Sequence, residues 1–289
     1  MKAAILNGSL YQGDACDRLT ISAADRGFLL GDGLFETLPI LNGHPLWWTE
    51  HRQRLNESAQ LLDLPIDEKV LEDSVSQLCA LSFQSEPSNA ILRIALSRGA
   101  GGRGLLPPAN PSPTLLATLT PLPQNLAFED MKLASSSIRR NEYSITARIK
   151  SSNYLDNIQA ARKAEAAGAD DALLRNTSGS IASTTIGNIF ALFGKCLITP
   201  PLADGVLAGV MRGQLLSLAP QWGFEAVEAS LAPEDAKKAD GLFMTNSLRF
   251  IRRVTALDGH AFPSATNDPI AQLQSTLRAH IATLTGAAL

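Results

Sequence analysis

The first half of the chain combines short apolar runs with amphipathic segments. Residues 3–6, 35–41, 90–96 and 114–119 are apolar runs with the length of buried strands. The pairs Asn7-Gly8 and Asn42-Gly43 close the first two runs and are typical of tight hairpin turns. Two helices are predicted after the second run, because apolar residues recur there near multiples of a helical turn: Trp48, Leu55, Ala59 and Leu62, then Leu71, Val75, Leu78 and Leu81.

The second half mixes strands and helices again. A strand-like run over 144–149 precedes a predicted helix over 153–167, which Gly168 closes because glycine adopts the left-handed conformation of a helix end. Further strands are predicted around 172–174, 189–193 and 241–245. The last helix begins at Asp268-Pro269 and carries one apolar stripe, made of Ile270, Leu273, Leu277, Ile281 and Leu284.

The interleaving of strands and helices in both halves predicts an α/β (α+β) protein of two domains, with a site between them. Residues 120–124 contain two prolines and no periodic pattern, which is typical of a linker. We therefore expect a small α/β domain over 1–120, a linker over 121–126 and a larger α/β domain over 127–289.

Composition and charge exclude several classes of protein. Of the 289 residues, 45% are hydrophobic and 18% charged, as in folded rather than disordered chains. The 25 basic and 28 acidic residues give a net charge of -3, which leaves no basic face for nucleic acid or an anionic membrane. Three scattered cysteines argue against a disulfide framework or a zinc site. The N-terminus turns polar too early for a signal peptide, and no apolar run approaches the roughly 20 residues of a membrane span. We expect a cytoplasmic protein without a bound metal.

A glycine-rich motif, residues 99–104, matches the G-x-G-x-x-G pattern of dinucleotide-binding folds. That mechanism requires a helix directly after the motif, whose N-terminal amides hold the pyrophosphate. Here three prolines follow within residues 105–111, so no such helix forms and a nicotinamide site is rejected. The loop is a flexible connection, or it carries Arg98 and Arg103 to an anionic substrate, since guanidinium groups bind carboxylates at two points.

Three further features suggest a phosphate-bearing carbonyl cofactor when they are taken together. Lys150 lies between the strand-like run and a helix, where a partly desolvated amine becomes nucleophilic. Residues 208–212 lead from a proline-rich loop into a helix N-terminus, which binds anions. Asn246 and Ser247 end a strand with small polar groups. Each feature alone fits an ordinary solvated lysine, capped helix or strand end.

At this point the residues resemble a known family, the class IV aminotransferases, which are pyridoxal 5'-phosphate (PLP) enzymes of fold type IV. The resemblance extends from about residue 25 to residue 254 and keeps the order of the family's motifs. It rests on D-R-G-F and G-D-G-L-F-E at 25–36, H-R-Q-R-L at 51–55, R-I-K-S-S-N-Y-L at 148–155, G-A-D-D-A-L-L at 168–174, N-I-F at 188–190, T-P-P at 199–201 and G-V-M-R at 209–212.

The resemblance implies a two-domain fold like that of D-amino acid aminotransferase and a role for each matching residue. Lys150 would form the Schiff base with PLP and move the proton. Arg54, Val210, Met211, Asn246 and Ser247 would bind the cofactor phosphate, and Tyr154 would face the ring hydroxyl. Phe35, Arg98 and Arg103 would contact the substrate. Family members are usually homodimers, so a homodimer is expected as well.

One position departs from the family pattern. A glutamate that hydrogen-bonds to the pyridine nitrogen is usual five residues before the asparagine of N-x-F, and Ser183 occupies that position here. A neutral hydroxyl does not keep the ring nitrogen protonated. Either the ring works unprotonated, or another group substitutes, or catalysis is impaired.

The loop over 97–104 favours one reaction within the family. Its sequence, S-R-G-A-G-G-R-G, is similar to that of aminodeoxychorismate lyases, whose substrate carries two carboxylates. The resemblance therefore implies a PLP-dependent 4-amino-4-deoxychorismate lyase, which releases pyruvate and 4-aminobenzoate for folate biosynthesis. The alternative is a transaminase of D-amino acids, branched-chain amino acids or (R)-amines. A third hypothesis, prompted by Ser183, is a PLP-binding protein without efficient catalysis.

Some charged residues permit both an ordinary and a functional interpretation. Arg139 and Arg140 are expected either in a solvated turn or at the mouth of the substrate site. Arg26 and Glu36 are expected either to form an ion pair or to belong to the site.

Overall fold

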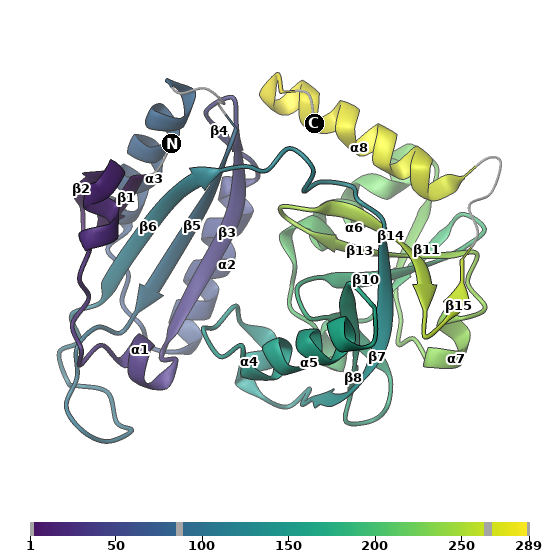
Figure 1. Ribbon diagram of the computed structural model, residues 1–289, viewed down its shortest axis with the longest axis horizontal. Helices are drawn as coiled ribbons and strands as arrows, with labels where there is room; N and C mark the ends of the chain where they lie inside the picture. The colour runs from purple at the N-terminus through teal and green to yellow at the C-terminus, as the bar shows by residue number, and fades with distance from the viewer. Residues whose placement is uncertain (1–2, 85–88, 263–267, 288–289) are drawn as a thin grey trace. The chain divides into compact units, whose positions relative to one another are not determined.

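The computed structural model describes residues 3–84, 89–262 and 268–287. The described chain divides into two units (Figure 1). Unit 1 contains the chain up to Pro123 together with Lys150–Asn153 and Leu284–Ala287, and unit 2 contains Gln124–Ile149 and Tyr154–Thr283. None of the described helices combines the length and the apolar character needed to span a membrane.

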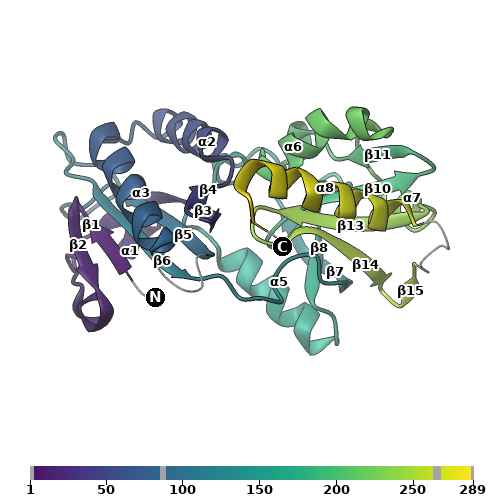
Figure 2. The same ribbon diagram turned by 90° about the horizontal axis from the view of Figure 1, so that it is seen from above.

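Unit 1 is built on a six-stranded sheet with the strand order β2-β1-β6-β5-β3-β4. Its strands are β1 (Ala3–Leu6), β2 (Ser9–Gln12), β3 (Gly33–Leu41), β4 (His44–Pro45), β5 (Ala90–Ser97) and β6 (Thr114–Pro121). Its helices are α1 (Arg26–Leu30), α2 (Trp48–Leu61), α3 (Glu68–Phe83) and the short 3₁₀ helix η1 (Gly13–Arg18). The helices α2 and α3 cover one face of this sheet, as Figures 1 and 2 show.

The strands and both long helices predicted for this part of the chain are confirmed. Asn7 and Gly8 have φ values of 48° and 83°, as a two-residue hairpin turn between β1 and β2 requires. The strand β6 extends to Pro121, which lies opposite Ala90, so the strand continues into the segment that the sequence suggested as a linker. Pro121 is tolerated at this position because it is the last residue of the strand.

Unit 2 is built on a nine-stranded sheet with the order β12-β11-β10-β13-β14-β7-β8-β9, and β15 pairs with β14. Its strands are β7 (Met131–Arg140), β8 (Asp171–Asn176), β9 (Ile181–Thr184), β10 (Asn188–Phe193), β11 (Cys196–Thr199), β12 (Glu225–Glu228), β13 (Gly241–Asn246), β14 (Phe250–Leu257) and β15 (His260–Ala261). Its helices are α4 (Ile145–Arg148), α5 (Leu155–Ala166), α6 (Val210–Leu218), α7 (Pro233–Ala236) and α8 (Pro269–Thr285), with 3₁₀ turns η2 (Leu202–Asp204) and η3 (Ala219–Trp222).

The core of unit 2 has two parts. One cluster joins strands from most of the sheet and includes Leu173, Ile189, Met244 and Val254. A smaller cluster lies under α5, where alanines of the helix pack closely against Ala172 and Leu174 of β8. Because alternate residues of β8 enter different clusters, both faces of this strand are buried.

Two sequence expectations for unit 2 need correction, and two strands were missed. The run over 144–149 is not a strand: Ser144 accepts a hydrogen bond from the Thr146 amide and caps the helix α4. Leu284, expected in the buried stripe of α8, is 49% exposed, whereas the other four members of the stripe are buried. The strands β7 and β14 were not predicted, because serines interrupt the first and two buried arginines, Arg252 and Arg253, interrupt the second.

Candidate active site

The backbone of Lys150 is held beside β3 of unit 1. The Phe35 amide donates to the Lys150 carbonyl at 2.9 Å, and the Ser152 amide donates to the Gly33 carbonyl at 3.0 Å. The Lys150 side chain is half-buried, and its Nζ lies 4.4 Å from the centroid of the Phe35 ring. Two of the predicted site residues, Lys150 and Phe35, are therefore in contact through a cation–π interaction.

A third residue, Arg93 of β5, joins this pair and was not predicted. Its guanidinium carbon lies 4.0 Å from the centroid of the same Phe35 ring. The sequence held a signal for it, because Arg93 is the one charged residue within the apolar run 90–96. Two cations over one aromatic ring attract an anionic ligand such as a carboxylate.

Arg54, the predicted phosphate ligand, is held by a buried carboxylate. Its Nε and Nη2 donate to the two oxygens of Glu36 at 2.8 and 2.6 Å. His51 occupies the same cluster, with its Nδ1 2.7 Å from Glu36 Oε2. Glu36 therefore pairs with Arg54 and His51 rather than with Arg26. The result is a rigid guanidinium at the sheet-facing side of α2.

The protonation states in this cluster follow from opposing effects. Burial favours the neutral form of Glu36, but the charge of Arg54 and the hydrogen bonds from His51 and Arg54 outweigh it and lower the pKa to about 2. For His51, burial and the nearby cations Arg54 and Lys150 lower the pKa despite the contact with Glu36. At neutral pH the cluster therefore contains a carboxylate, a guanidinium and a neutral imidazole.

The N-terminus of α6 in unit 2 presents the amides of Val210 and Met211, both predicted to bind phosphate. The preceding residue, Gly209, provides no side-chain cap, so the first-turn amides lack protein acceptors in the helix. A Cβ at Gly209 would lie 2.0 Å from Asn188 Oδ1, which makes glycine necessary here. Asn188 in turn donates from Nδ2 to the Leu207 carbonyl at 2.9 Å and fixes the loop that enters the helix. This turn has the form of an anion site.

Two hydroxyl groups of unit 2 are buried and have no hydrogen-bond partner among the described residues. They belong to Ser183 of β9, which is 6% exposed, and Thr245 of β13, which is 0% exposed. Thr245 lies opposite Asn188 in the sheet, and Asn188 holds the loop before α6, so Thr245 and the α6 turn share Asn188 as a neighbour. Buried hydroxyls without partners are uncommon and suit a ligand that supplies the missing bond.

The residues after Thr245 form a tight turn. Asn246 Oδ1 accepts from the amides of Leu248 and Arg249, and its Nδ2 donates to the Ile186 carbonyl. The Asn246 side chain thus shapes the turn, and Ser247 lies within it, half-buried. Tyr154, predicted to face the ring hydroxyl, is the N-cap residue of α5 and is also half-buried.

Asp171, the buried acid of the strand next to Ser183, does not take the place of the expected glutamate. Asp171 is a buried acid of the adjacent strand β8, and burial raises its pKa. Ser183 lies opposite Leu174, and Asp171 precedes Leu174 by three positions. Side chains alternate along a strand, so Asp171 and Ser183 point to opposite faces.

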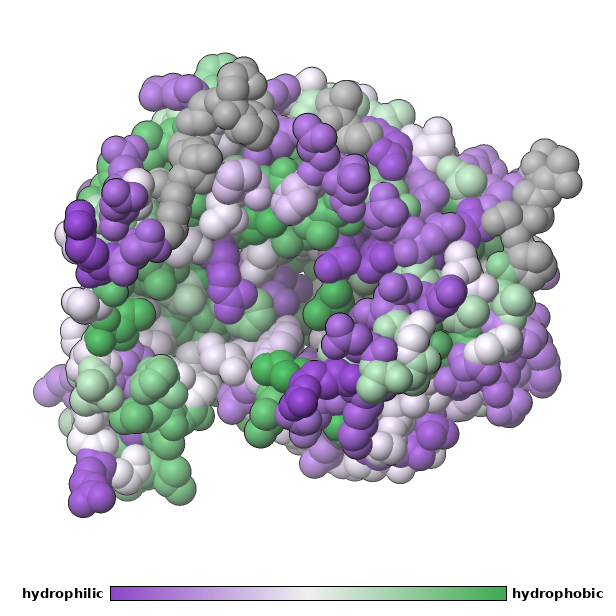
Figure 3. Space-filling model, viewed as in Figure 1, coloured by the Kyte–Doolittle hydropathy of each residue, from purple (hydrophilic) through white to green (hydrophobic). Residues whose placement is uncertain are grey.

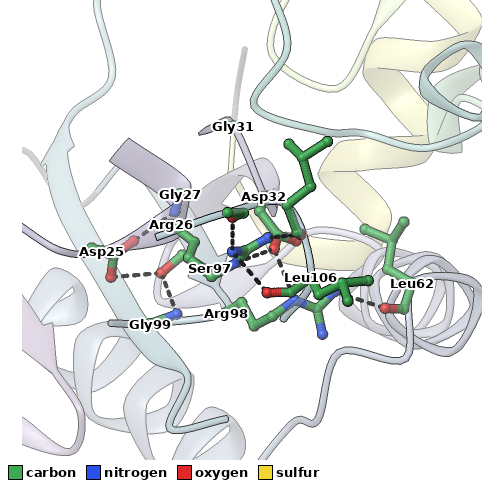
Figure 4. A network of polar contacts seen from close by, with 12 residues as sticks. Asp25, Arg26, Gly27, Gly31, Asp32, Leu62, Ser97, Arg98, Gly99 and Leu106 are labelled. Carbon is green, nitrogen blue, oxygen red and sulfur yellow. Dashed lines mark hydrogen bonds and ion pairs between the residues drawn. The ribbon is translucent and has the colours of Figure 1, made fainter. Parts of the chain in front are cut away.

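Arg98 was predicted to bind substrate from a flexible loop, but its guanidinium is engaged within unit 1. Its Nε donates to Asp32 at 2.9 Å, and its Nη1 and Nη2 donate to the carbonyls of Asp63 and Leu62 (Figure 4). The side chain is buried, with 7% of its surface exposed. Arg98 therefore fixes the loop, which the sequence alone could not reveal.

Arg26 completes this network. Its Nε donates to the same Asp32 oxygen at 2.8 Å, and its terminal nitrogens donate to the carbonyls of residues 104–106. Burial raises the pKa of Asp32, but the hydrogen bonds from Arg98 and Arg26 outweigh it and the pKa lies below its usual value. Asp32 thus stays ionised and links both arginines.

The loop between β5 and β6 presents Arg103 and two leucines to the surface. Arg103 is exposed and has no polar partner among the residues that the structure describes. Leu105 and Leu106 are 82% and 88% exposed, and Phe28 of the neighbouring α1 is 82% exposed. Figure 3 shows the apolar surface at the lower left, over α1 and this loop. No helix follows the glycine motif, as expected.

Comparison with known proteins identifies the family. Residues 33–257 match the family model described as amino-transferase class IV. The chain belongs to the class IV aminotransferase family. It is therefore a member of an enzyme family, and its two units have the fold type IV architecture that the sequence resemblance implied.

Class IV relatives with different activities are similar to this chain. A putative branched-chain-amino-acid aminotransferase of Methanocaldococcus jannaschii is 32% identical over 83% of both chains. An aminodeoxychorismate lyase of Bacillus subtilis is 29% identical over 88% of this chain and 87% of its own. The solved structure of a putative 4-amino-4-deoxychorismate lyase from Legionella pneumophila is 32% identical, with a TM-score of 0.80 over 91% of this chain and 95% of that one.

Proposed function

We propose that this class IV enzyme is a PLP-dependent lyase that converts 4-amino-4-deoxychorismate to 4-aminobenzoate and pyruvate. The observation that carries the proposal is the contact of Lys150 and Arg93 with one ring, Phe35. It places an amine and a guanidinium, a group suited to binding carboxylates, each within 4.4 Å of the same ring centroid. The similarity to lyases in B. subtilis and L. pneumophila and the S-R-G-A-G-G-R-G loop support the choice of reaction.

PLP is the cofactor expected for the family, and the described residues fit it. Lys150 supplies the amine, the first turn of α6 supplies backbone amides that no N-cap side chain engages, and Arg54 is a rigid cation. The orphaned hydroxyls of Ser183 and Thr245 suit a polar ring or phosphate oxygen. When bound, PLP supplies an electron sink for charge that develops at the substrate's α-carbon.

The protein's own residues have distinct tasks in this proposal. The Lys150 amine removes and returns the α-proton, and general base catalysis of this kind contributes roughly 10²–10⁴ in rate. Phe35 orients the amine through its ring face. Arg93 and the exposed Arg103 bind substrate carboxylates, while Arg98 and Asp32 hold the loop that bears Arg103. Tyr154, Asn246 and Ser247 are proposed to contact the ring hydroxyl and the phosphate.

Transamination is the second candidate. The M. jannaschii relative, a putative branched-chain-amino-acid aminotransferase, supports it. Proton movement by Lys150 is common to both reactions, so the residues around Phe35 serve either one. A cofactor-binding role without efficient catalysis is a third candidate, because Ser183 gives the ring nitrogen no carboxylate partner.

We also propose a cytoplasmic homodimer that acts in folate biosynthesis. The exposed apolar side chains of Phe28, Leu105 and Leu106 support self-association, since monomers rarely expose such clusters. Light scattering of the purified protein measures the oligomeric state directly, and a monomer would contradict the proposal.

Two measurements test the function. With added PLP, the purified protein should show an absorption band of the bound cofactor and should retain the cofactor after borohydride treatment. The variant Lys150→Ala should lose both properties. The protein is then supplied with 4-amino-4-deoxychorismate, and separately with D-alanine or leucine plus 2-oxoglutarate. Formation of 4-aminobenzoate supports the lyase, and formation of glutamate without it supports the transaminase. Retention of PLP without either product would support the third candidate.

A further inference from the structure

Arg140, at the end of β7, joins two segments that lie far apart in the sequence. Its Nε donates to the Gly205 carbonyl at 2.5 Å, and its Nη2 donates to the Ala147 carbonyl at 2.9 Å. Gly205 follows η2 in the loop that leads into α6, and Ala147 belongs to α4, three residues before Lys150. One planar guanidinium thus holds two backbone carbonyls at once, which a lysine cannot do with the same geometry.

The surrounding contacts make this junction rigid. Gly205 has a φ of 80°, and a Cβ there would lie 2.8 Å from the Glu142 backbone, so the loop packs closely against the residues after β7. Glu142 is itself anchored by the Thr177 amide at 3.0 Å and the Ser178 hydroxyl at 3.0 Å. Burial lowers the pKa of Arg140, and Tyr154 is near enough to oppose this effect.

We propose that Arg140 is a positioning residue that holds the loop before the phosphate-binding turn of α6 against α4, the helix that precedes Lys150 in the sequence. The inference rests on the proposed use of PLP and goes beyond it, because Arg140 itself contacts no ligand in this scheme. Gly205 lies four residues before Gly209, and the Asn188 side chain holds the loop between them at the Leu207 carbonyl. Without Arg140 the loop that leads to the amides of Val210 and Met211 loses its anchor at Gly205.

Comparing the binding of two ligands, PLP and pyridoxal, distinguishes this role of Arg140 from a general effect on folding. PLP uses both the lysine and the phosphate turn, whereas pyridoxal lacks the phosphate and depends on the lysine. A variant that merely destabilises the protein lowers the affinity for both ligands by the same factor. A variant that loosens the α6 turn weakens the binding of PLP more than the binding of pyridoxal. The ratio of the pyridoxal Kd to the PLP Kd then falls.

The test compares Arg140→Gln with Arg139→Gln, a matched control at the adjacent, exposed arginine. Absorbance titrations give both Kd values, and borohydride trapping with peptide mass analysis checks that each ligand bonds to Lys150. We expect the Kd ratio to fall at least tenfold in Arg140→Gln and to stay within twofold of the unaltered protein in Arg139→Gln. An unchanged ratio in Arg140→Gln overturns the inference.

A conservative variant keeps the test decisive if Arg140→Gln does not fold. Arg140→Lys retains the charge but reaches one carbonyl at a time, so the ratio should fall at least threefold. A ratio equal to that of the unaltered protein would overturn the inference. If the unaltered protein forms no PLP adduct at Lys150, the proposed function itself fails, which is a different result from an unchanged ratio in a protein that binds PLP.

Discussion

Glu36 and Arg54 form a two-point ion pair in which the carboxylate is 1% exposed. The pair joins β3 to α2 and fixes the guanidinium without any ligand. Removing one partner of a buried pair leaves the other charge uncompensated, which costs about 3–5 kcal/mol. The pair therefore affects both stability and the proposed phosphate site.

The first prediction concerns acid stability. Glu36 has a folded-state pKa of about 2 against an ordinary 4.5, so its contribution is complete above pH 4.5 and is lost as the pH falls towards 2. The unfolding free energy should drop by on the order of 3 kcal/mol through this window. Urea titrations at several pH values measure it. Glu36→Gln should be less stable at pH 7 and should lack this part of the slope; parallel curves for the two proteins would contradict the prediction.

The second prediction concerns the start of α6. Gly209→Ala places a methyl group against Asn188 and should displace the helix turn, weakening PLP binding by about tenfold, since strain of this kind costs about 1–3 kcal/mol. Gly213→Ala in the same helix is the control, because a Cβ there meets nothing within 4 Å. It should leave the PLP affinity unchanged and add about 0.5–1 kcal/mol of stability. Equal PLP affinities in the two variants would refute the steric argument.

The third prediction concerns the buried hydroxyls without partners. Ser183→Ala and Thr245→Val should each stabilise the cofactor-free protein by about 1 kcal/mol, because an unsatisfied buried group is removed. Each should also weaken PLP binding about fivefold. Ser74→Ala removes a buried hydroxyl that does have a partner, the Val70 carbonyl, and should show neither effect. Thermal unfolding and PLP titration test this prediction. A loss of stability in both Ser183→Ala and Thr245→Val would contradict it.

The fourth prediction concerns the loop that carries Arg103. Asp32→Asn removes the charge that links Arg26 to Arg98, so residues 104–106 should open more often. Trypsin should cut after Arg103 about tenfold faster, which corresponds to roughly 1.4 kcal/mol of easier opening. Asp73→Asn, at an exposed acid of α3, is the control. Mass spectrometry of the fragments over time gives the rates, and equal rates in the two variants would contradict the role given to Asp32.

Local patterns in the sequence predicted those elements whose stabilising contacts are close along the chain. The Asn7-Gly8 hairpin and the Asp268 cap are examples, because turn and cap geometry involve neighbouring residues. Strands whose partners are distant were missed when polar residues broke the apolar run, as in β7 and β14. The strand-like segment before Lys150 is helical because a serine cap outweighs the pattern over so short a stretch.

The sequence by itself determined the family, the position of Lys150 and the order of the motifs, since these are properties of residue identity and spacing. Only the tertiary structure decided which charges meet. It pairs Glu36 with Arg54 rather than Arg26, engages Arg98 with backbone carbonyls, and brings Arg93 to Phe35. Ion pairs and cation–π contacts depend on distances of a few ångströms between strands and loops, and a one-dimensional pattern does not encode those distances.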